Sequence, residues 1–477
     1  MNFIKDKLNY NEIKKIYVLI VVALFCVSVI PIIEDHFSDN NLSTVRASGN
    51  TLYVDSSGGG NNHTSIQDAI NASSDGDTII INETSIEEGN ITVNVSVTIK
   101  NGTGVSPVIE CRGLHGFNVT VSNVTIQNIT INNGTSGWGV RVYNSSVPSN
   151  VLEGVVLDNI TVNNSLIGMI FDNATQCNVT YCNVYNSSVC GISIGYKQWL
   201  LTQYSHCSYI NISHCTISQT VRGQSGPGIE IYNSTYCKIS NSTIYNMSYS
   251  ATGPLTRGIE MIISGFNTII DNNISSCDLG GIYLGLSDNN TIRSNELYNN
   301  TETANDPRPL DIKAGIFIKA SSNNTIFENN VSYSEYGISL TTFQGNSSEN
   351  NTIYLNNIYN NTIQNGFDNC SNNNWNDSTY GNYWDSYNWY TEGAYDNSTD
   401  GIFDSPYNIP GGSGVDNYPL RVMWDGNSLP NGTSSIYGYV NTSGNNFGIY
   451  NATVRLYHNQ TNLFIETQTN ITGYFNF

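Results

Sequence analysis

Two glutamates, Glu230 and Glu260, hold the same place in two copies of a short apolar motif, Gly-Ile-x-Ile and Gly-Ile-x-Met. In two later copies the same place is taken by Tyr283 and Phe317. Two neighbouring carboxylates can act as acid and base on a glycosidic bond, and aromatic rings bind the faces of sugars. This set is the first candidate for a ligand site.

Two arginines, Arg222 and Arg257, come shortly before the two glutamates and can hold an acidic sugar. The alternative is a solvated stripe on which the aromatic rings only stack against one another. The sequence shows no further Asp and Lys/Arg cluster of the kind that catalysis on an acidic polysaccharide requires, so no catalytic residue is assigned.

A second candidate site is an acidic loop near the C-terminus. Oxygen-bearing residues stand at positions 1, 3, 5 and 9 of a calcium-loop spacing, Gly401 stands at position 6, and a backbone carbonyl is offered at position 7. The expected ligands are Asp396, Ser398, Asp400, the carbonyl of Ile402, and Asp404. Position 12, where such loops carry Glu, is Tyr407. The alternative is an acidic turn that binds no ion.

The elements that position the first set form a repeat. Gly281, Gly315 and Gly337 each begin an apolar-x-apolar piece, and each is followed by two further short pieces that begin with Asn-Thr-Ile or Asn-x-apolar. Alternation with period two predicts strands that bury one face. Asn and Gly between the pieces supply the corners, since both tolerate positive φ.

The repeat extends towards the N-terminus through earlier Gly anchors at 168, 191, 228 and 258. Three short strands per unit cannot bury their own faces, so the units must stack. The fold predicted is all-β: a right-handed parallel β-helix of about a dozen coils, with coils roughly 4.8 Å apart. The outward residues of one sheet are then expected in a single row, namely Arg141, Ile170, Ser193, Glu230, Glu260, Tyr283, Phe317 and Ser339.

Small residues are expected to line the interior corners. Asn290, Asn324 and Asn351 hold one such place in the later coils, and Cys177 and Cys237 hold it earlier. A second place is held by Asn residues in the later coils and by Cys182 and Cys215 earlier. Cysteine is therefore expected as a small buried side chain. Cys182 and Cys215 fall on neighbouring coils, so a disulfide between these two is the alternative.

Composition excludes nucleic acid as a partner. The 477-residue chain has a formal net charge of −20 with only 12% charged residues, so no basic face exists to neutralise phosphates. Asn-x-Ser/Thr sequons number roughly three dozen, among them Asn94, Asn128, Asn211, Asn273 and Asn441. Many of them fall in expected strands, so fewer than half are expected to carry sugar.

The N-terminus predicts export. Four lysines precede an uncharged apolar run, Ile16–Ile33, which is long enough for a short membrane helix or a signal segment. The lysines place the N-terminus inside and the remainder outside. An uncleaved anchor is favoured over a cleaved signal, and the expected location is the cell surface or envelope.

Segments near both ends of the predicted solenoid resemble a known family. Ser65–Ile81 is expected to form a short helix that covers the open end of the solenoid, and it resembles the entry to the β-helix of NosD-type proteins of the CASH group, within the pectin-lyase-like fold. Tyr380–Asp385, Asp400–Ile409 and Gly414–Leu420 resemble their C-terminal signature, with Phe403 where Gly is more usual. The resemblance covers about residues 51–425.

The NosD resemblance implies copper as a further cofactor. His206-Cys207 and His214-Cys215 are the only pairs that suggest it, and the five Met and the remaining His do not cluster. Calcium is therefore the metal predicted, and copper is not expected.

The predicted domains follow from these boundaries. They are an anchor and spacer (1–50), the β-helix (51–375), an aromatic and Asp-rich cap (376–425), a linker (426–434), and an incomplete module (435–477) that resembles a carboxypeptidase-regulatory-like β-sandwich. The function predicted is a non-catalytic carbohydrate-binding or adhesion protein of the cell surface. A polysaccharide lyase, hydrolase or epimerase is the first alternative, and copper-enzyme maturation of the NosD kind is the second.

Overall fold

The computed structural model describes most of the chain from Gly49 onwards. The described ranges are 49–56, 62–133, 136–143, 151–195, 206–219, 226–248, 256–301, 313–388, 392–396, 400–426, 437–440, 449, 451–457, 464–470 and 474–476. The predicted apolar helix at Ile16–Ile33 lies outside these residues. Within them, no helix combines the length and the apolar character needed to cross a membrane.

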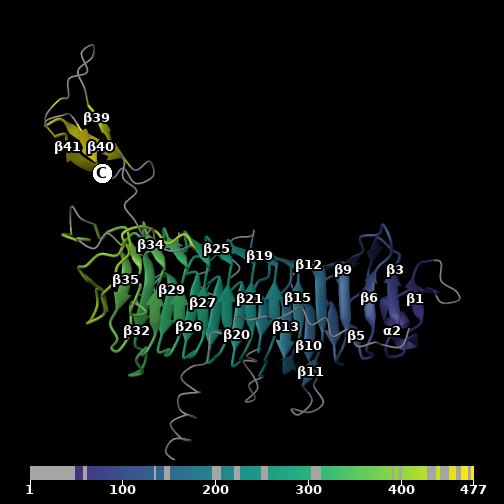
Figure 1. Cartoon of the computed structure of the whole chain (residues 1–477). Coiled ribbons are helices and arrows are strands. Elements are labelled where there is room, and N and C mark those ends of the chain that lie inside the picture. Colours follow the sequence, from purple (N-terminus) through teal and green to yellow (C-terminus); the bar gives the residue numbers. More distant parts are fainter. Residues whose placement is uncertain are drawn as a thin grey trace, which may run out of the picture. The chain divides into compact units, whose positions relative to one another are not determined.

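Three parallel sheets form the β-helix, and the strands follow one another in sequence order along the stack (Figure 1). Sheet I has 11 strands. They are β5 (Ile91–Val93), β8 (Phe117–Val119), β10 (Trp138–Tyr143), β13 (Ile167–Asp172), β17 (Cys190–Ile194), β20 (Ile229–Tyr232), β23 (Ile259–Ile262), β26 (Ile282–Gly285), β29 (Ala314–Lys319), β32 (Tyr336–Thr341) and β35 (Gln364–Asp368).

Sheets II and III are joined because two long strands run through both. Sheet II contains β1 (Thr51–Val54), β3 (Thr78–Ile81), β6 (Thr98–Asn101), β9 (Thr125–Asn132), β12 (Val156–Asn163), β15 (Asn178–Thr180), β18 (Asn211–Ser213), β21 (Lys238–Ser240), β24 (Thr268–Ile270), β27 (Thr291–Arg293), β30 (Thr325–Phe327) and β33 (Thr352–Tyr354). Sheet III contains β4 (Ser85–Ile86), β7 (Val108–Glu110), the second halves of β9 and β12, β16 (Asn183–Tyr185), β19 (Thr216–Ser218), β22 (Thr243–Tyr245), β25 (Asn273–Ser275), β28 (Glu296–Tyr298), β31 (Asn330–Ser332), β34 (Asn357–Tyr359) and β36 (Tyr383–Trp384).

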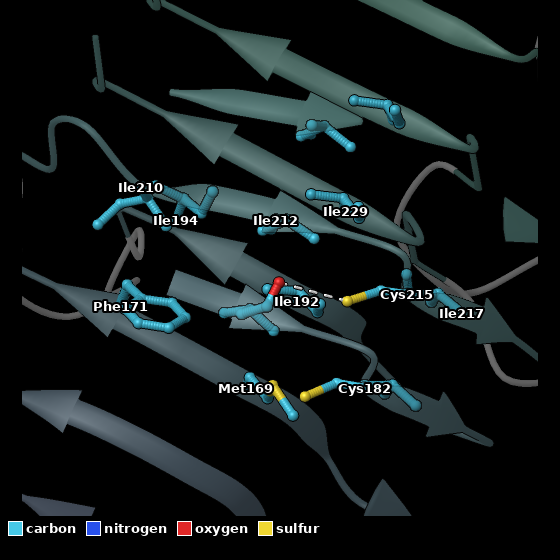
Figure 2. Close-up of a cluster of buried hydrophobic side chains, with 14 of the residues drawn as sticks. Met169, Phe171, Cys182, Ile192, Ile194, Ile210, Ile212, Cys215, Ile217 and Ile229 are labelled. Atoms are coloured by element: carbon cyan, nitrogen blue, oxygen red, sulfur yellow. Dashed lines mark hydrogen bonds between the residues drawn. The ribbon is translucent and has the colours of Figure 1, made fainter. Parts of the chain in front are cut away.

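The predicted all-β solenoid is therefore confirmed, and its number of coils is close to the dozen expected. Inward side chains alternate with outward ones along each strand, and the inward set forms one continuous apolar core. Figure 2 shows part of that core, where Met169, Phe171, Ile192 and Ile194 of sheet I share the interior with the thiols of Cys182 and Cys215.

Asparagine ladders line two interior corners. In the corner between sheets II and III, Asn329 Nδ2 donates to Asn356 Oδ1 at 2.9 Å, and Asn329 Oδ1 accepts from the backbone N–H of Asn295 at 3.0 Å. Asn290, Asn324 and Asn351 repeat this pattern in the corner between sheets I and II. The side-chain amides thus satisfy backbone groups that the turns leave without a strand partner.

Cysteine replaces asparagine in these rows as predicted. The Sγ–H of Cys182 donates to the carbonyl of Thr180 at 3.3 Å, and that of Cys215 to the carbonyl of Ser213 at 3.3 Å. The nine cysteines among the described residues are all buried free thiols. Burial raises the pKa of Cys177 and of Cys237 to about 12, so both thiols stay protonated.

Glycine stands at the anchor positions for a different reason from the one predicted. Asn289 and Asn323 do adopt left-handed φ, at 60° and 58°. The anchor Gly315, by contrast, does not: a Cβ added there would lie 2.3 Å from Val331 Cγ1 and 3.1 Å from the carbonyl oxygen of Gly337. Glycine therefore marks a close approach between coils rather than a turn conformation.

Both ends of the solenoid are covered. The helix α2 (Ile66–Ala72) buries Ile66, Ala69 and Ile70, and Ser65 caps it by accepting a hydrogen bond from the N–H of Asp68. This confirms the predicted cap helix. At the other end Trp375 and Trp384 are buried in the core, with ring centroids 5.6 Å apart.

Two buried aspartates hold the indoles of this C-terminal cap. Trp384 Nε1 donates to Asp416 Oδ2 at 2.9 Å, and Trp375 Nε1 donates to Asp368 Oδ2 at 3.0 Å. The backbone N–H groups of Asn382 and Tyr418 also donate to Asp416. Burial nevertheless raises the pKa of Asp416 from 3.8 to about 7.

This raised pKa predicts a cap that is more stable in mild acid. The folded-state pKa of Asp416 exceeds its unfolded value, so protonation of this carboxyl group stabilises the folded state. That stabilisation is complete below about pH 4 and is lost as the pH rises through about 7. Between pH 5 and pH 8 the free energy of unfolding should fall by about 2–3 kcal/mol. Urea unfolding of the full chain followed by tryptophan fluorescence measures this change. Asp416→Asn should flatten the pH dependence, and a free energy that rises with pH would contradict the assignment.

The C-terminal residues form two antiparallel pairs. β39 (Tyr437–Tyr439) pairs with β42 (Tyr474–Asn476), and β40 (Thr453–Tyr457) pairs with β41 (Phe464–Gln468). The predicted partial β-sandwich stays a prediction. The remaining short strands are β2 (Asn62–His63), β11 (Leu152–Glu153), β14 (Ala174–Thr175), β37 (Tyr407–Asn408) and β38 (Val415–Asp416).

Candidate functional site

The outward row of sheet I has the register that the repeat predicts. Glu230 is the Cα partner of Glu260, Glu260 of Tyr283, and Tyr283 of Phe317. On the other side Ser193 is the partner of Glu230, and its hydroxyl donates to Glu230 Oε2 at 3.2 Å. The two carboxylates and the two rings therefore occupy four successive coils.

Arg257 joins this row through its side chain. Its Nη1 lies 2.5 Å from Glu260 Oε1, and its guanidinium carbon lies 3.6 Å from the centroid of the Tyr283 ring. The structure thus brings Arg257, Glu260 and Tyr283 into one cluster. Arg222 lies outside the described residues.

This face is far less exposed than the outward direction of its side chains implies. Glu260 is 7% exposed, Arg257 is 1% exposed and Phe317 is 2% exposed, whereas Glu230 and Tyr283 are partly exposed. Glu260 is buried and its Oε1 lies 2.5 Å from Arg257 Nη1, so the carboxylate is held in place and is poorly accessible to a polysaccharide. The predicted solvated stripe is therefore wrong for Glu260 and Phe317.

The N-terminal part of the row contains a second ion pair. Arg141 Nη2 lies 3.1 Å from Asp172 Oδ2, and the guanidinium carbon lies 3.8 Å from the centroid of the Tyr143 ring. Between the two ion pairs, Ile170 and Cys190 form a small buried apolar cluster. Burial and then the charge of Glu230 raise the pKa of the Cys190 thiol, which makes this cysteine a poor nucleophile.

A more exposed aromatic surface lies on the corner between sheets I and II. Tyr209, Tyr236 and Phe266 hold one position on three successive coils and are 52%, 48% and 51% exposed. Their rings are stacked, with centroids 5.1 Å and 5.3 Å apart. We call these three residues the aromatic corner.

A shallow hollow continues the same corner over the next three coils. Its lining includes Leu286, Asp288, Ala320, Ser322 and Glu349. The N–H of Phe266 lies 3.4 Å from the carbonyl oxygen of Asp288, so the hollow begins one coil beyond the aromatic corner. One edge of the solenoid thus offers exposed rings followed by hydroxyl and carboxylate groups.

This corner was not predicted from the sequence, although a signal for it is present there. Tyr209, Tyr236 and Phe266 stand immediately before the buried ladder residue, where Asn289 and Asn323 stand in later coils. All five adopt φ between 54° and 60°. Aromatic residues at a position that favours asparagine incur a backbone cost of about 1 kcal/mol, which suggests a role outside the fold itself.

Three of the predicted calcium ligands, Asp396, Asp400 and Asp404, lie among the described residues. Asp396 is buried and lies 3.4 Å from Arg421 Nη1, and Asp400 Oδ1 accepts from the N–H of Ile402 at 3.0 Å. Across the part of the chain that the structure describes, no group of three His, Cys, Asp or Glu side chains could hold a metal ion. Asp404 is described, whereas Ser398 is not. Calcium binding by this loop stays a prediction.

The two histidines considered for copper have other contacts. His206 Nδ1 lies 2.8 Å from the carbonyl oxygen of Asn233, and the His214 ring stacks on Tyr181 with centroids 4.9 Å apart. The neighbouring Cys207 and Cys215 are buried in the core. These contacts offer no reason to assign copper to this pair.

Comparison with known proteins identifies the fold. Residues 168–353 match the family model of the right-handed beta helix region, and no curated sequence matches the chain. A GH136 lacto-N-biosidase from Eubacterium ramulus has a similar structure, with a TM-score of 0.51 and 13% identity over 68% of this chain and 67% of that one.

Two further structures are similar at lower scores. A pectate lyase has a TM-score of 0.44 and 14% identity over 84% of this chain and 94% of its own. An alginate lyase from a Paenibacillus species has a TM-score of 0.40 and 13% identity over 63% of this chain and 97% of its own. At such identities a likeness shows the fold alone, which is the right-handed β-helix of the family model. The family match does not reach residues 376–425, so the NosD-type signature there stays a resemblance.

Proposed function

We propose that this chain is an exported β-helix protein that binds carbohydrate polymers at its aromatic corner without cleaving them, in an adhesion or envelope role. The observation that supports the proposal is the exposed stack of Tyr209, Tyr236 and Phe266, which leads into a hollow lined by polar groups. Aromatic rings contact the apolar faces of sugars, while hydroxyl, amide and carboxylate groups accept their hydroxyl protons.

The geometry of the corner suits a linear polymer. Six successive coils carry the rings and the hollow, and at about 4.8 Å per coil they offer an edge of roughly 25 Å. The flat, open surface lacks the enclosure with which catalytic sites exclude water. Affinity would then come from many weak contacts along one chain.

A lyase, hydrolase or epimerase is the second candidate, and one observation favours it. Glu230 and Glu260 are neighbours in register on sheet I, and Arg257 lies against Glu260. The burial of Glu260 and Arg257 counts against it, because a polysaccharide must reach the reacting groups. Copper-enzyme maturation is not supported by any observation on the described residues.

The test compares substitutions that keep the corner conformation. Tyr236→Asn and Phe266→Asn introduce the residue found at the same position in later coils, so the fold should be kept. On a glycan array followed by affinity measurement, the double variant should bind the selected glycan at least about tenfold more weakly, a loss of about 1.4 kcal/mol.

The matched control is Tyr181→Asn, which changes an equally exposed corner tyrosine between sheets II and III. It should bind the glycan as the wild type does. Equal binding by the double variant and the wild type would overturn the assignment to the aromatic corner. Release of shorter glycans or unsaturated ends by the wild-type protein would favour the enzyme instead.

A further inference from the structure

The corner between sheets III and I carries a second ordered row. Asn246, Ser276, Asn299, Tyr333 and Asn360 follow directly after β22, β25, β28, β31 and β34, whose registers align them on five successive coils. All five adopt left-handed φ, between 54° and 57°. The three asparagines are exposed.

Each of these asparagines begins a sequon. The triplets are Asn246-Met247-Ser248, Asn299-Asn300-Thr301 and Asn360-Asn361-Thr362. Ser276 and Tyr333 occupy the coils between them, so the three acceptors lie on alternate coils, about 10 Å apart. This separation leaves room for a sugar on each one.

The origin of the many sequons is visible in the same geometry. A left-handed corner favours Asn, the next residue points into the core, and the following residue is often Ser or Thr. Sequons are therefore a by-product of the corner, and the structure must decide which can be modified. An acceptor has to be exposed, and its neighbours must leave space for a glycan.

These two conditions count against some of the sequons. Asn133 is fully buried, and Asn211 and Asn273 lie within β18 and β25. Asn289, Asn323 and Asn350 are exposed but lie on consecutive coils, about 5 Å apart, so glycans on all three at once would be too close together. Asn94 is exposed and Asn128 is partly buried, and Asn441 lies outside the described residues.

Aromatic rings lie beside Asn299 and Asn360 in the row between sheets III and I. Asn360 Nδ2 donates to the hydroxyl of Tyr333 at 3.1 Å, and Tyr333 lies 5.1 Å from Tyr298 between ring centroids. Both rings are exposed, at 44% and 47%. They offer an apolar surface against which the first sugar on Asn299 or Asn360 can lie.

We propose that Asn246, Asn299 and Asn360 carry N-linked glycans on alternate coils of this corner. In the transfer step, Nδ2 of the asparagine bonds to C1 of the first sugar of a lipid-linked oligosaccharide. The bond between C1 and the phosphate oxygen breaks, the lipid phosphate leaves, and the amide loses one proton. The inference rests on the export part of the proposed function, because the donor is presented to exported chains.

The test is glycopeptide mass spectrometry on the protein isolated from the envelope of cells that make it. Peptides with Asn246, Asn299 and Asn360 should carry sugar, and the peptide with Asn133 should carry none. Bare peptides at all three positions, or equal occupancy of Asn133, would overturn the proposal.

A pair of variants separates sequon chemistry from folding. Thr301→Ser should keep the glycan on Asn299, whereas the nearly isosteric Thr301→Val should lose it with the melting temperature of the unmodified protein unchanged. A glycan retained in Thr301→Val would contradict the proposal. Binding at the aromatic corner is measured on unmodified recombinant protein. A result that contradicts carbohydrate binding there therefore does not contradict the proposed glycosylation sites, and absence of these glycans does not contradict carbohydrate binding.

Discussion

Replacing Asn329 with alanine should lower the free energy of unfolding by about 3–5 kcal/mol, because several buried backbone groups then lose a hydrogen-bond partner. Asn329 is fully buried, and its Nδ2 donates to the carbonyls of Ile292 and Phe327, both at 3.0 Å. It also links Asn295 to Asn356 in the ladder. Urea unfolding of the full chain, followed by circular dichroism, measures the loss.

The adjacent Asn330 is the matched control. It lies in β31 with its side chain outward, partly exposed, where it bonds to Glu296. Asn330→Ala should cost less than about 1 kcal/mol. Asn329→Cys should fall between the two, since Cys182 and Cys215 hold this place in earlier coils and donate to the same type of carbonyl. Similar losses for the Asn329→Ala and Asn330→Ala variants would show that the ladder contributes little.

The register of the fold follows from the sequence because each coil repeats the same apolar pattern. Counting from one Gly anchor to the next aligned Glu230, Glu260 and Tyr283 correctly, and the structure has the same pairs. The pattern does not depend on the insertions between coils, which change the connecting lengths without shifting the strands. The coil to which each outward residue of sheet I belongs could therefore be predicted from the sequence.

Burial on the outward face could not be predicted in the same way. The alternation of a strand says which direction Glu260 and Phe317 point, but it does not say what lies over them. What covers an outward side chain depends on contacts such as those of Arg257 with Glu260 and Tyr283, which no local pattern records. The solvated stripe was therefore the wrong expectation for these two residues.

The aromatic corner was missed for a related reason. Tyr236 and Phe266 stand outside the strands, in segments that a search for alternation treats as connections. Only alignment on the buried ladder residues Cys237 and Asn267 shows that they share one position. The corners of a β-helix are thus better aligned on the buried ladder residues than on the residues of the strands.

Replacing Arg257 with methionine should also lower the free energy of unfolding, by about 3–5 kcal/mol, because the buried carboxylate of Glu260 loses the guanidinium 2.5 Å away. Replacing both residues with methionine should restore most of that loss, since two apolar side chains of similar size need no compensating charge. Arg455→Met, which removes an exposed pair with Glu466, is the control and should cost less than about 1 kcal/mol.

The same variants decide between the two functions proposed for this chain. If the ion pair between Arg257 and Glu260 is structural, the variant with methionine at both of these positions keeps its stability and its glycan binding. Carbohydrate recognition then belongs to the aromatic corner. If Arg257→Met leaves the stability unchanged but abolishes activity on a polysaccharide, the pair serves a substrate and the enzyme is the better description. Stability and activity are measured on the same preparations, so folding defects cannot be mistaken for lost chemistry.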